Sequence, residues 1–95
     1  MISAYQAKTG FVKRTIAGET LLVPVGKTTQ EFNGMVMLNE TGSYLWDLMQ
    51  EPKTKEELVV AMKAEFDATE EELIADIDEF VEYGQSQGML LYIEE

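Results

Sequence analysis

Hydrophobic residues are arranged differently in the two parts of the chain, as short runs before residue 39 and at helical spacing after it. The runs Phe11–Ile16 and Glu19–Val25 are rich in Val, Ile, Leu, Phe and Thr, and they flank the two-residue turn candidate Ala17-Gly18. This pattern predicts a β-hairpin. The short apolar run Met35–Leu38 follows a turn signal and predicts a third strand. Residues 1–9 show no period, and we expect them to form a loose lead-in.

Apolar residues recur every three to four positions after residue 39, which predicts three helices. Asn39 or Thr41 is placed to cap the first helix, which should end before Pro52. The second and third helices begin with the capping-box pattern T-x-x-E, at Thr54 and Thr69.

The third helix should stop at Gly88, and the apolar run Met89–Ile93 behind it is compatible with a short C-terminal strand. Strands followed by helices are typical of the α+β class. We therefore predict a winged-helix-like packing, with a three-stranded antiparallel sheet followed by three helices. The length of 95 residues predicts a single domain over residues 1–95.

The composition argues against most kinds of catalysis. The chain has no His and no Cys, so the common general base, the thiolate nucleophile and the usual zinc ligands are all absent. Chemistry by carboxylates alone stays open but is the least favoured reading, because a domain this small has little room for a deep pocket. We expect no enzyme activity, no catalytic residues, no metal site and no cofactor.

The net charge of −11 disfavours nucleic acid and anionic membrane surfaces as partners. No basic residue follows Lys63, so the third predicted helix would repel a phosphate backbone. The chain has no apolar run of the length that a membrane span needs, and residues 1–9 lack the apolar core of a signal peptide. A cytoplasmic location is expected by default.

The predicted strand Met35–Leu38 has no charge and no proline to protect its edge. An unprotected edge is suited to pairing with an extended peptide. Alternation would place Val36 and Leu38 on one face of the strand, and Met35 and Met37 on the other. Two alternatives remain open: the C-terminal strand covers this edge, or a second copy of the chain does, so that both a monomer and a homodimer are compatible.

Several segments taken in order resemble the PqqD family, over about residues 10–92. Each motif alone is weak, but their order and spacing together are fairly specific. They are Ile16-Ala17-Gly18-Glu19, Leu21-Leu22-Val23-Pro24-Val25-Gly26, Leu38-Asn39-Glu40-Thr41-Gly42 with Leu45-Trp46, Thr54 with Glu56-Glu57-Leu58, Glu65-Phe66-Asp67, Asp76 with Phe80, and Gly88-Met89-Leu90.

This resemblance implies a role as a recognition element and peptide chaperone for ribosomally made, post-translationally modified peptides. The leader of a precursor peptide would add as a strand to the third strand and lie against the third helix. The peptide would then be presented to a modifying enzyme, often a radical SAM enzyme. Carried onto this chain, the resemblance implies the binding residues Gly34, Met35, Val36, Met37, Leu38, Ile74, Ile77, Asp78, Val81 and Gln85.

Two departures from the family pattern bear on the pathway. The hairpin carries Lys13-Arg14 without the aromatic partner typical of members in pyrroloquinoline quinone synthesis, and Gln50-Glu51-Pro52 replaces an Asp-Gly. We therefore expect a relative that serves another modified peptide. The alternative function is an acidic adaptor that docks a basic protein through the third helix.

Overall fold

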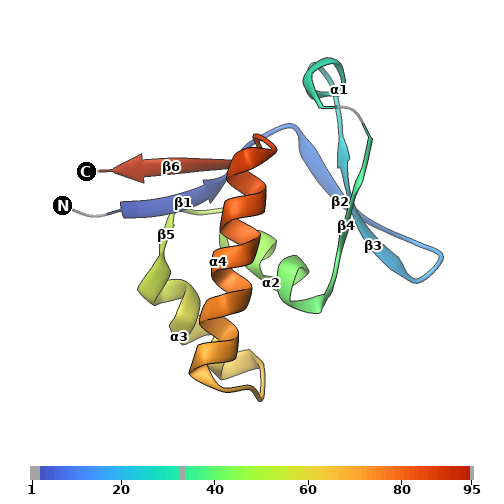
Figure 1. Cartoon of the computed structure of the whole chain (residues 1–95). Coiled ribbons are helices and arrows are strands. Elements are labelled where there is room, and N and C mark those ends of the chain that lie inside the picture. The colour runs from blue at the N-terminus through green and yellow to red at the C-terminus, as the bar shows by residue number, and fades with distance from the viewer. Residues whose placement is uncertain (1–2, 33, 95) are drawn as a thin grey trace.

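Two small antiparallel sheets organise the fold of the computed structural model, which describes residues 3–32 and 34–94 (Figure 1). One sheet has the strand order β5-β1-β6, made of Lys53–Thr54, Ser3–Ala7 and Leu90–Glu94. The other has the order β2-β3-β4, made of Phe11–Ile16, Glu19–Pro24 and Val36–Leu38. The helices are α1 (Thr28–Glu31), α2 (Glu40–Leu48), α3 (Lys55–Glu65) and α4 (Glu70–Ser86). The α+β class is confirmed.

The hairpin β2-β3 forms where the sequence predicts it. Ala17 and Gly18 both have positive φ, at 53° and 81°, which is the backbone of a type I′ turn. That turn follows the right-handed twist of the flanking strands and fixes Ile16 opposite Glu19. Residues 36–38 add the third strand, antiparallel to β3.

Side-chain caps set the starts of the three longer helices. The Asn39 side chain accepts a hydrogen bond from the Gly42 N–H at 2.8 Å and begins α2. Thr54 and Thr69 form the predicted capping boxes, in which the threonine hydroxyl accepts from the N–H three residues on and the glutamate there accepts in return. Gly88 lies beyond the end of α4 with a φ of 74°. The predicted helix starts are confirmed.

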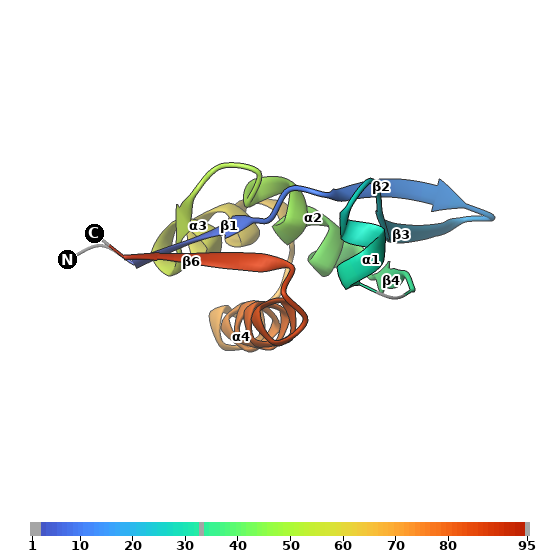
Figure 2. The ribbon, with the colours of Figure 1, turned by 90° about the horizontal axis from the view of Figure 1, so that it is seen from above.

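The expectation of a loose lead-in over residues 1–9 is wrong for residues 3–7. These residues form β1, the central strand of its sheet, which pairs with β5 on one side and with β6 on the other. The first and last strands, β1 and β6, therefore lie side by side (Figure 2). Ala4 and Ala7 supply the buried positions of β1, and such small side chains leave no apolar period in the sequence.

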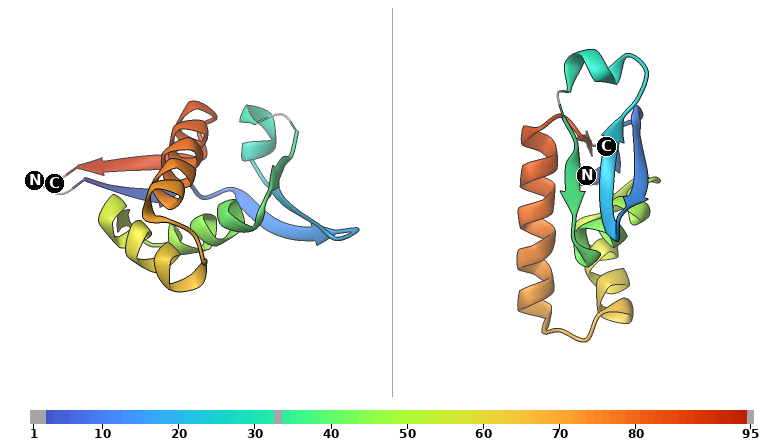
Figure 3. Two further views of the ribbon diagram at one scale, coloured as in Figure 1. Left: turned by 60° about the horizontal axis from the view of Figure 1, so that its bottom comes forward. Right: turned by 90° about the vertical axis from the view of Figure 1, so that its right-hand side faces the viewer.

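Both sheets contribute to one hydrophobic core. Leu22 of β3 and Leu90 of β6 belong to the same buried cluster, together with residues of α2, α3 and α4. The largest fully buried side chains are Leu22, Leu45, Met49, Leu58, Met62, Leu73, Ile77 and Met89. Beyond this core the β2-β3 hairpin projects to one side of a flat molecule of 36 × 36 × 18 Å (Figures 2 and 3).

A tight glycine connects the two sheets. Gly10 lies between β1 and β2 with a φ of 102°, and a β-carbon at this position would overlap the hydroxyl of Thr28.

Over residues 3–32 and 34–94, none of the helices has the length and apolar character that crossing a membrane requires. The winged-helix-like label stays a prediction.

Candidate functional site

The outer strand β4 has one free edge within the described part of the chain. β4 pairs with β3 alone, through Thr20 opposite Leu38, Leu21 opposite Met37 and Leu22 opposite Val36. The C-terminal strand, which was one candidate to cover this edge, pairs with β1 instead. Residues 3–32 and 34–94 therefore provide no second partner strand for residues 36–38.

The register of the β2-β3 hairpin determines which residue pairs along the strands are hydrogen-bonded. Residues that flank a two-residue turn form a hydrogen-bonded pair, so the backbone groups of Ile16 and Glu19 face each other. Hydrogen-bonded and non-hydrogen-bonded pairs then alternate along the strands. The bond from the Val25 N–H to the Gly10 carbonyl, at 2.9 Å, agrees with this phase.

The same phase identifies the backbone groups of β4 that face outward. Since Glu19 faces β2, the backbone groups of Thr20 and Leu22 face β4, and their partners Leu38 and Val36 face back toward β3. The N–H and C=O of Met37 must therefore point away from the sheet. Met37 offers one donor and one acceptor to an incoming strand.

Side chains on β4 alternate as the sequence predicts. Val36 and Leu38 are each 7% exposed and belong to the core, whereas Met37 between them is 66% exposed. Met35, which was predicted to begin this strand, instead directly precedes it and is 61% exposed. Large exposed apolar side chains beside an unpaired strand edge are unusual in a protein without a partner for that edge. Methionine is flexible and polarizable, so it adapts to different contacting side chains.

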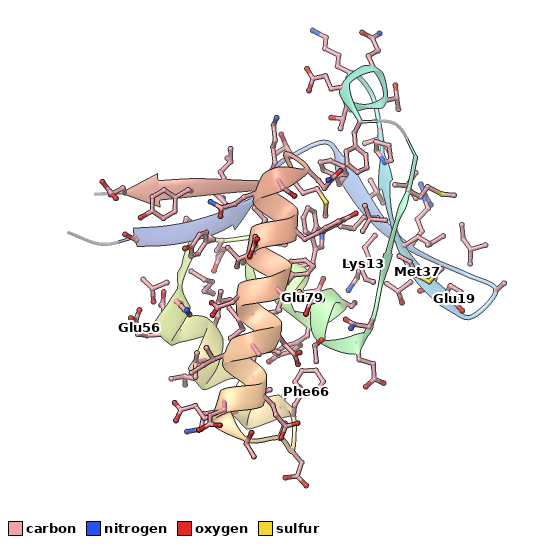
Figure 4. All side chains as sticks on the ribbon, in the orientation of Figure 1. Lys13, Glu19, Met37, Glu56, Phe66 and Glu79 are labelled. Atoms are coloured by element: carbon pink, nitrogen blue, oxygen red, sulfur yellow. The ribbon has the colours of Figure 1, made fainter. Side chains whose placement is uncertain are left out.

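A groove of about 540 Å³ separates β4 from α4. Residues of β4, of the N-terminal end of α2 and of one face of α4 line it, with Glu19 at the edge (Figure 4). From α4 come Asp76, Glu79, Phe80 and Tyr83; from the other elements come Glu19, Val36, Met37, Leu38, Asn39, Thr41 and Gly42. Figure 3 shows β4 and α4 running in opposite directions on the two sides of this space.

Gly42 lets α4 approach α2 closely at the floor of the groove. A β-carbon at Gly42 would lie 3.0 Å from the Asn39 Oδ1 and 3.3 Å from the Phe80 ring, so a larger residue would require a small shift of one of these side chains. Phe80 is half-buried and Tyr83 is exposed. The groove thus has an apolar and aromatic wall on α4 facing the free edge of β4.

The structure brings together only part of the predicted site. Val36, Met37 and Leu38 line the groove, and Met35 and Gly34 directly precede them. The helix residues predicted for the opposite wall are Ile74, Ile77, Asp78, Val81 and Gln85, and none of these five lines the groove.

Those five residues lie elsewhere on α4. Ile77 and Val81 are buried in the core, Ile74 is half-buried and Gln85 is exposed. Asp78 forms an ion pair with Lys55 of α3. The hydrogen bond that the Lys55 amine donates to Asp78 in this pair raises the pKa of Lys55. Val81 is a core residue, so Val81→Asp should destabilise the fold and is unsuitable as a test of the groove.

The physical reason is the width of the apolar stripe on α4. Each residue turns the helix by about 100°, which puts Asp76, Glu79 and Tyr83 on one side of Phe80. Ile74, Asp78 and Gln85 lie about 120° to 160° away on the other side. Periodicity defines the central core row but does not tell which flank faces β4. The pair Asp76 and Phe80, which also carries the family resemblance, was the available signal.

Carboxylates dominate the charge of the groove. Glu19 on β3 and Asp76 and Glu79 on α4 line it, and its described lining contains no Lys and no Arg. None of these three carboxylates takes part in the ion pairs among residues 3–32 and 34–94. Across the same residues no three acidic side chains gather closely enough to hold a metal ion. The groove can offer backbone hydrogen bonds, apolar contacts and negative charge.

These features define the class: a small α+β protein in which an outer strand with a free edge faces a helix across a groove. The model of the PqqD family, described as coenzyme PQQ synthesis protein D, matches residues 19–90, and the chain belongs to this family. The match begins at the first residue of β3 and ends in β6, so it contains the whole groove.

A solved structure supports the fold. The chain is similar to TbiB1, whose structure is that of a complex with the TbiA(beta) leader peptide. The TM-score is 0.68 at 25% sequence identity, and the match covers 90% of this chain and 93% of TbiB1. No curated protein matches the chain.

Proposed function

We propose that this protein binds the leader segment of a ribosomally made precursor peptide as an added strand on β4 and presents that peptide to a modifying enzyme. The single observation that carries the proposal is the unpaired edge of β4 facing a groove beside α4. Membership of the PqqD family and the similarity to a protein solved with a leader peptide support it.

Strand addition would use the two kinds of contact that the groove offers. The outward N–H and C=O of Met37 would give hydrogen bonds that do not depend on sequence, each worth about 0.5–1.5 kcal/mol net. Alternate side chains of the peptide would enter the groove against Phe80 and Tyr83. Backbone contacts would thus supply affinity, and the groove would supply selectivity.

The proposed role needs no catalytic group in this chain. Holding the peptide next to an enzyme raises the effective concentration of the one at the other, which speeds the modification step. We propose a radical SAM enzyme as the partner and a pathway other than pyrroloquinoline quinone synthesis. The departures at Lys13-Arg14 and Gln50-Glu51-Pro52 are the reason for the second choice.

Calorimetry and amide exchange test the proposal together. The probes are synthetic peptides covering the N-terminal halves of short reading frames that flank the gene of this chain. We expect one of them to bind and to slow the exchange of the Met37 amide, because strand addition gives this outward N–H an acceptor. The amides of Val36 and Leu38, which already face β3, serve as internal controls and should change little.

Two outcomes would contradict the proposal. If a peptide binds but leaves Met37 exchange unchanged, then the site is elsewhere. If instead a basic protein binds through the outer face of α4 and raised salt abolishes the complex, the acidic adaptor is the better description.

A further inference from the structure

We propose that the groove selects peptides carrying a lysine or arginine two residues from an apolar anchor, on the side that lies near Leu38 and Asn39. This inference rests on the proposed function and adds the sequence pattern of its ligand. Three observations carry it: the position of the carboxylates in the groove, their lack of cationic partners, and the match between helix and strand spacing.

Two of the three groove carboxylates, Asp76 and Glu19, lie toward one end of the groove, while Glu79 directly precedes Phe80 on α4. β4 and α4 run in opposite directions, so Asp76 lies toward the end where β4 leads into α2, while Tyr83 lies toward the start of β4 (Figure 3). Glu19 precedes Thr20, the partner of Leu38, and so it borders the same end as Asp76. A peptide strand along β4 would therefore pass from an aromatic region into an acidic one.

These carboxylates have no cation within the described residues to neutralise them. Asp76, Glu79 and Glu19 are exposed and belong to none of the ion pairs there, and α4 contains no Lys or Arg. Like charges gathered around a groove repel each other and also repel an acidic ligand. A basic side chain of the peptide would relieve this repulsion, and an acidic one would add to it.

The spacing of α4 fits a specific pattern in the peptide. Phe80 and Asp76 are four residues apart, which is about 6 Å along a helix axis. Successive side chains on one face of a strand, at positions i and i+2, are about 6.6 Å apart. An apolar side chain placed over Phe80 therefore brings the second residue along the strand next to Asp76, and the residue between them points to the opposite face.

A display experiment with random linear peptides tests this pattern. The library is selected on the wild-type chain and, in parallel, on Asp76→Lys, Glu82→Lys and Met37→Pro. Glu82 is exposed on α4 but does not line the groove, so Glu82→Lys makes the same kind of charge change outside the site. We expect wild type and Glu82→Lys to enrich peptides with a basic residue two positions from an apolar one, and Asp76→Lys to lose this pattern.

Calorimetry with an enriched peptide then separates position from net charge. Replacing its basic residue with Gln should weaken binding about fivefold, the upper range for a solvent-exposed charge pair. Moving that residue by one position should weaken binding equally, because a shift of one turns the side chain to the other face. Undiminished affinity of the shifted peptide overturns the inference, since a general attraction between charges would then suffice.

The two proposals fail in different ways. If the enriched peptides lose binding to Met37→Pro but show no basic residue at the expected spacing, strand addition stands and the charge pattern is wrong. If no enriched peptide depends on Met37, the proposed function fails, and the inference fails with it.

Discussion

The two sheets of this protein differ in how far along the chain their strands are separated. The sheet β2-β3-β4 is built from residues 11–38, one strand after the other, whereas β5-β1-β6 joins residues 3–7 with 53–54 and 90–94. The first sheet is local and supplies one wall of the groove, and the second pairs the first strand, β1, with the last, β6. The candidate site and the pairing of β1 with β6 thus involve different sheets of this small protein.

Their outer strands also differ. Both β4 and β6 are edge strands, and both expose large apolar residues. β6 ends with Glu94, followed by Glu95 in the sequence, and charges of this kind discourage strand pairing. β4 has no charge and opens onto the groove beside α4. Of these two edges, only that of β4 combines the absence of charge with an adjacent groove, as the proposed strand addition requires.

Removing a core side chain tests whether the two sheets form one folding unit. Leu22 of β3 is fully buried in the cluster that also contains Leu90 of β6. We expect Leu22→Ala to lower the free energy of unfolding by about 3 kcal/mol, the middle of the range for such cavities. Denaturant unfolding followed by Trp46 fluorescence measures this loss.

Amide exchange of the same variant decides the question of cooperativity. With a shared core, protection should fall by a similar factor in β3 and in β1. If β3 amides exchange early while β1 keeps its wild-type protection, the sheets are separate units and the comparison must be redrawn.

Proline substitutions on the two edges test which edge binds peptide. Met37→Pro removes the outward N–H of β4 without removing a bond to β3, and we expect it to weaken peptide binding about tenfold, from the loss of one bond and its local geometry. Calorimetry with a peptide that binds wild type measures the change, and circular dichroism checks the fold.

Tyr92→Pro is the matched control on β6. The Lys8 N–H donates to the Met89 carbonyl at 2.8 Å, and alternation from that pair places the Tyr92 N–H on the outer side of β6 as well. This variant should keep wild-type affinity. Equal losses in the two variants would mean that proline acts through the fold and not through the free edge.

The difference between the sheets also explains what the sequence alone could predict. The hairpin and the helix starts depend on residues one to three positions apart, such as Ala17-Gly18 and Thr54 with Glu57, so they were predicted correctly. Pairing of β1 with β6 joins residues more than 80 positions apart and leaves no local pattern. The candidate site residues on β4 could be predicted from a local pattern. Those on α4 could not, because their choice requires knowing which flank of the helix faces β4.

Thr54, in the sheet β5-β1-β6, offers a test with a smaller expected effect. As part of β5, Thr54 pairs with Ala4 of β1. It also caps α3, since its hydroxyl accepts a hydrogen bond from the Glu57 N–H at 3.2 Å. Thr54→Ala removes the cap and keeps the strand backbone, so we expect a loss of about 1 kcal/mol in the free energy of unfolding. Thr54→Ser retains a capping hydroxyl and should stay close to wild type. A full loss in the serine variant would contradict the capping role.

A substitution in the turn between β2 and β3 should instead raise the stability of the protein. Ala17 holds a φ of 53°, where a β-carbon is unfavourable, and Asn is preferred at this position of a type I′ turn. We expect Ala17→Asn to raise the free energy of unfolding by about 0.5 kcal/mol, a part of the cost of a left-handed alanine. Thermal unfolding measures this gain. A loss of stability would show that the turn backbone differs from type I′.

The smallest expected effect is a change of stability with pH, and it depends on the hydrogen bond between Thr54 of β5 and Glu57 of α3. The Thr54 N–H donates to the Glu57 carboxylate at 2.9 Å, and this bond lowers the pKa of Glu57 below 4.5. A carboxyl whose pKa is lower in the folded state stabilises the fold above its unfolded pKa, and this contribution is lost as the pH falls through the folded pKa. Glu57→Gln should therefore be less stable than wild type at neutral pH, and the difference should shrink toward zero below 4.5. Unfolding curves of both proteins across this pH range measure the difference. A gap that does not change with pH would mean that the Glu57 charge contributes nothing to the cap.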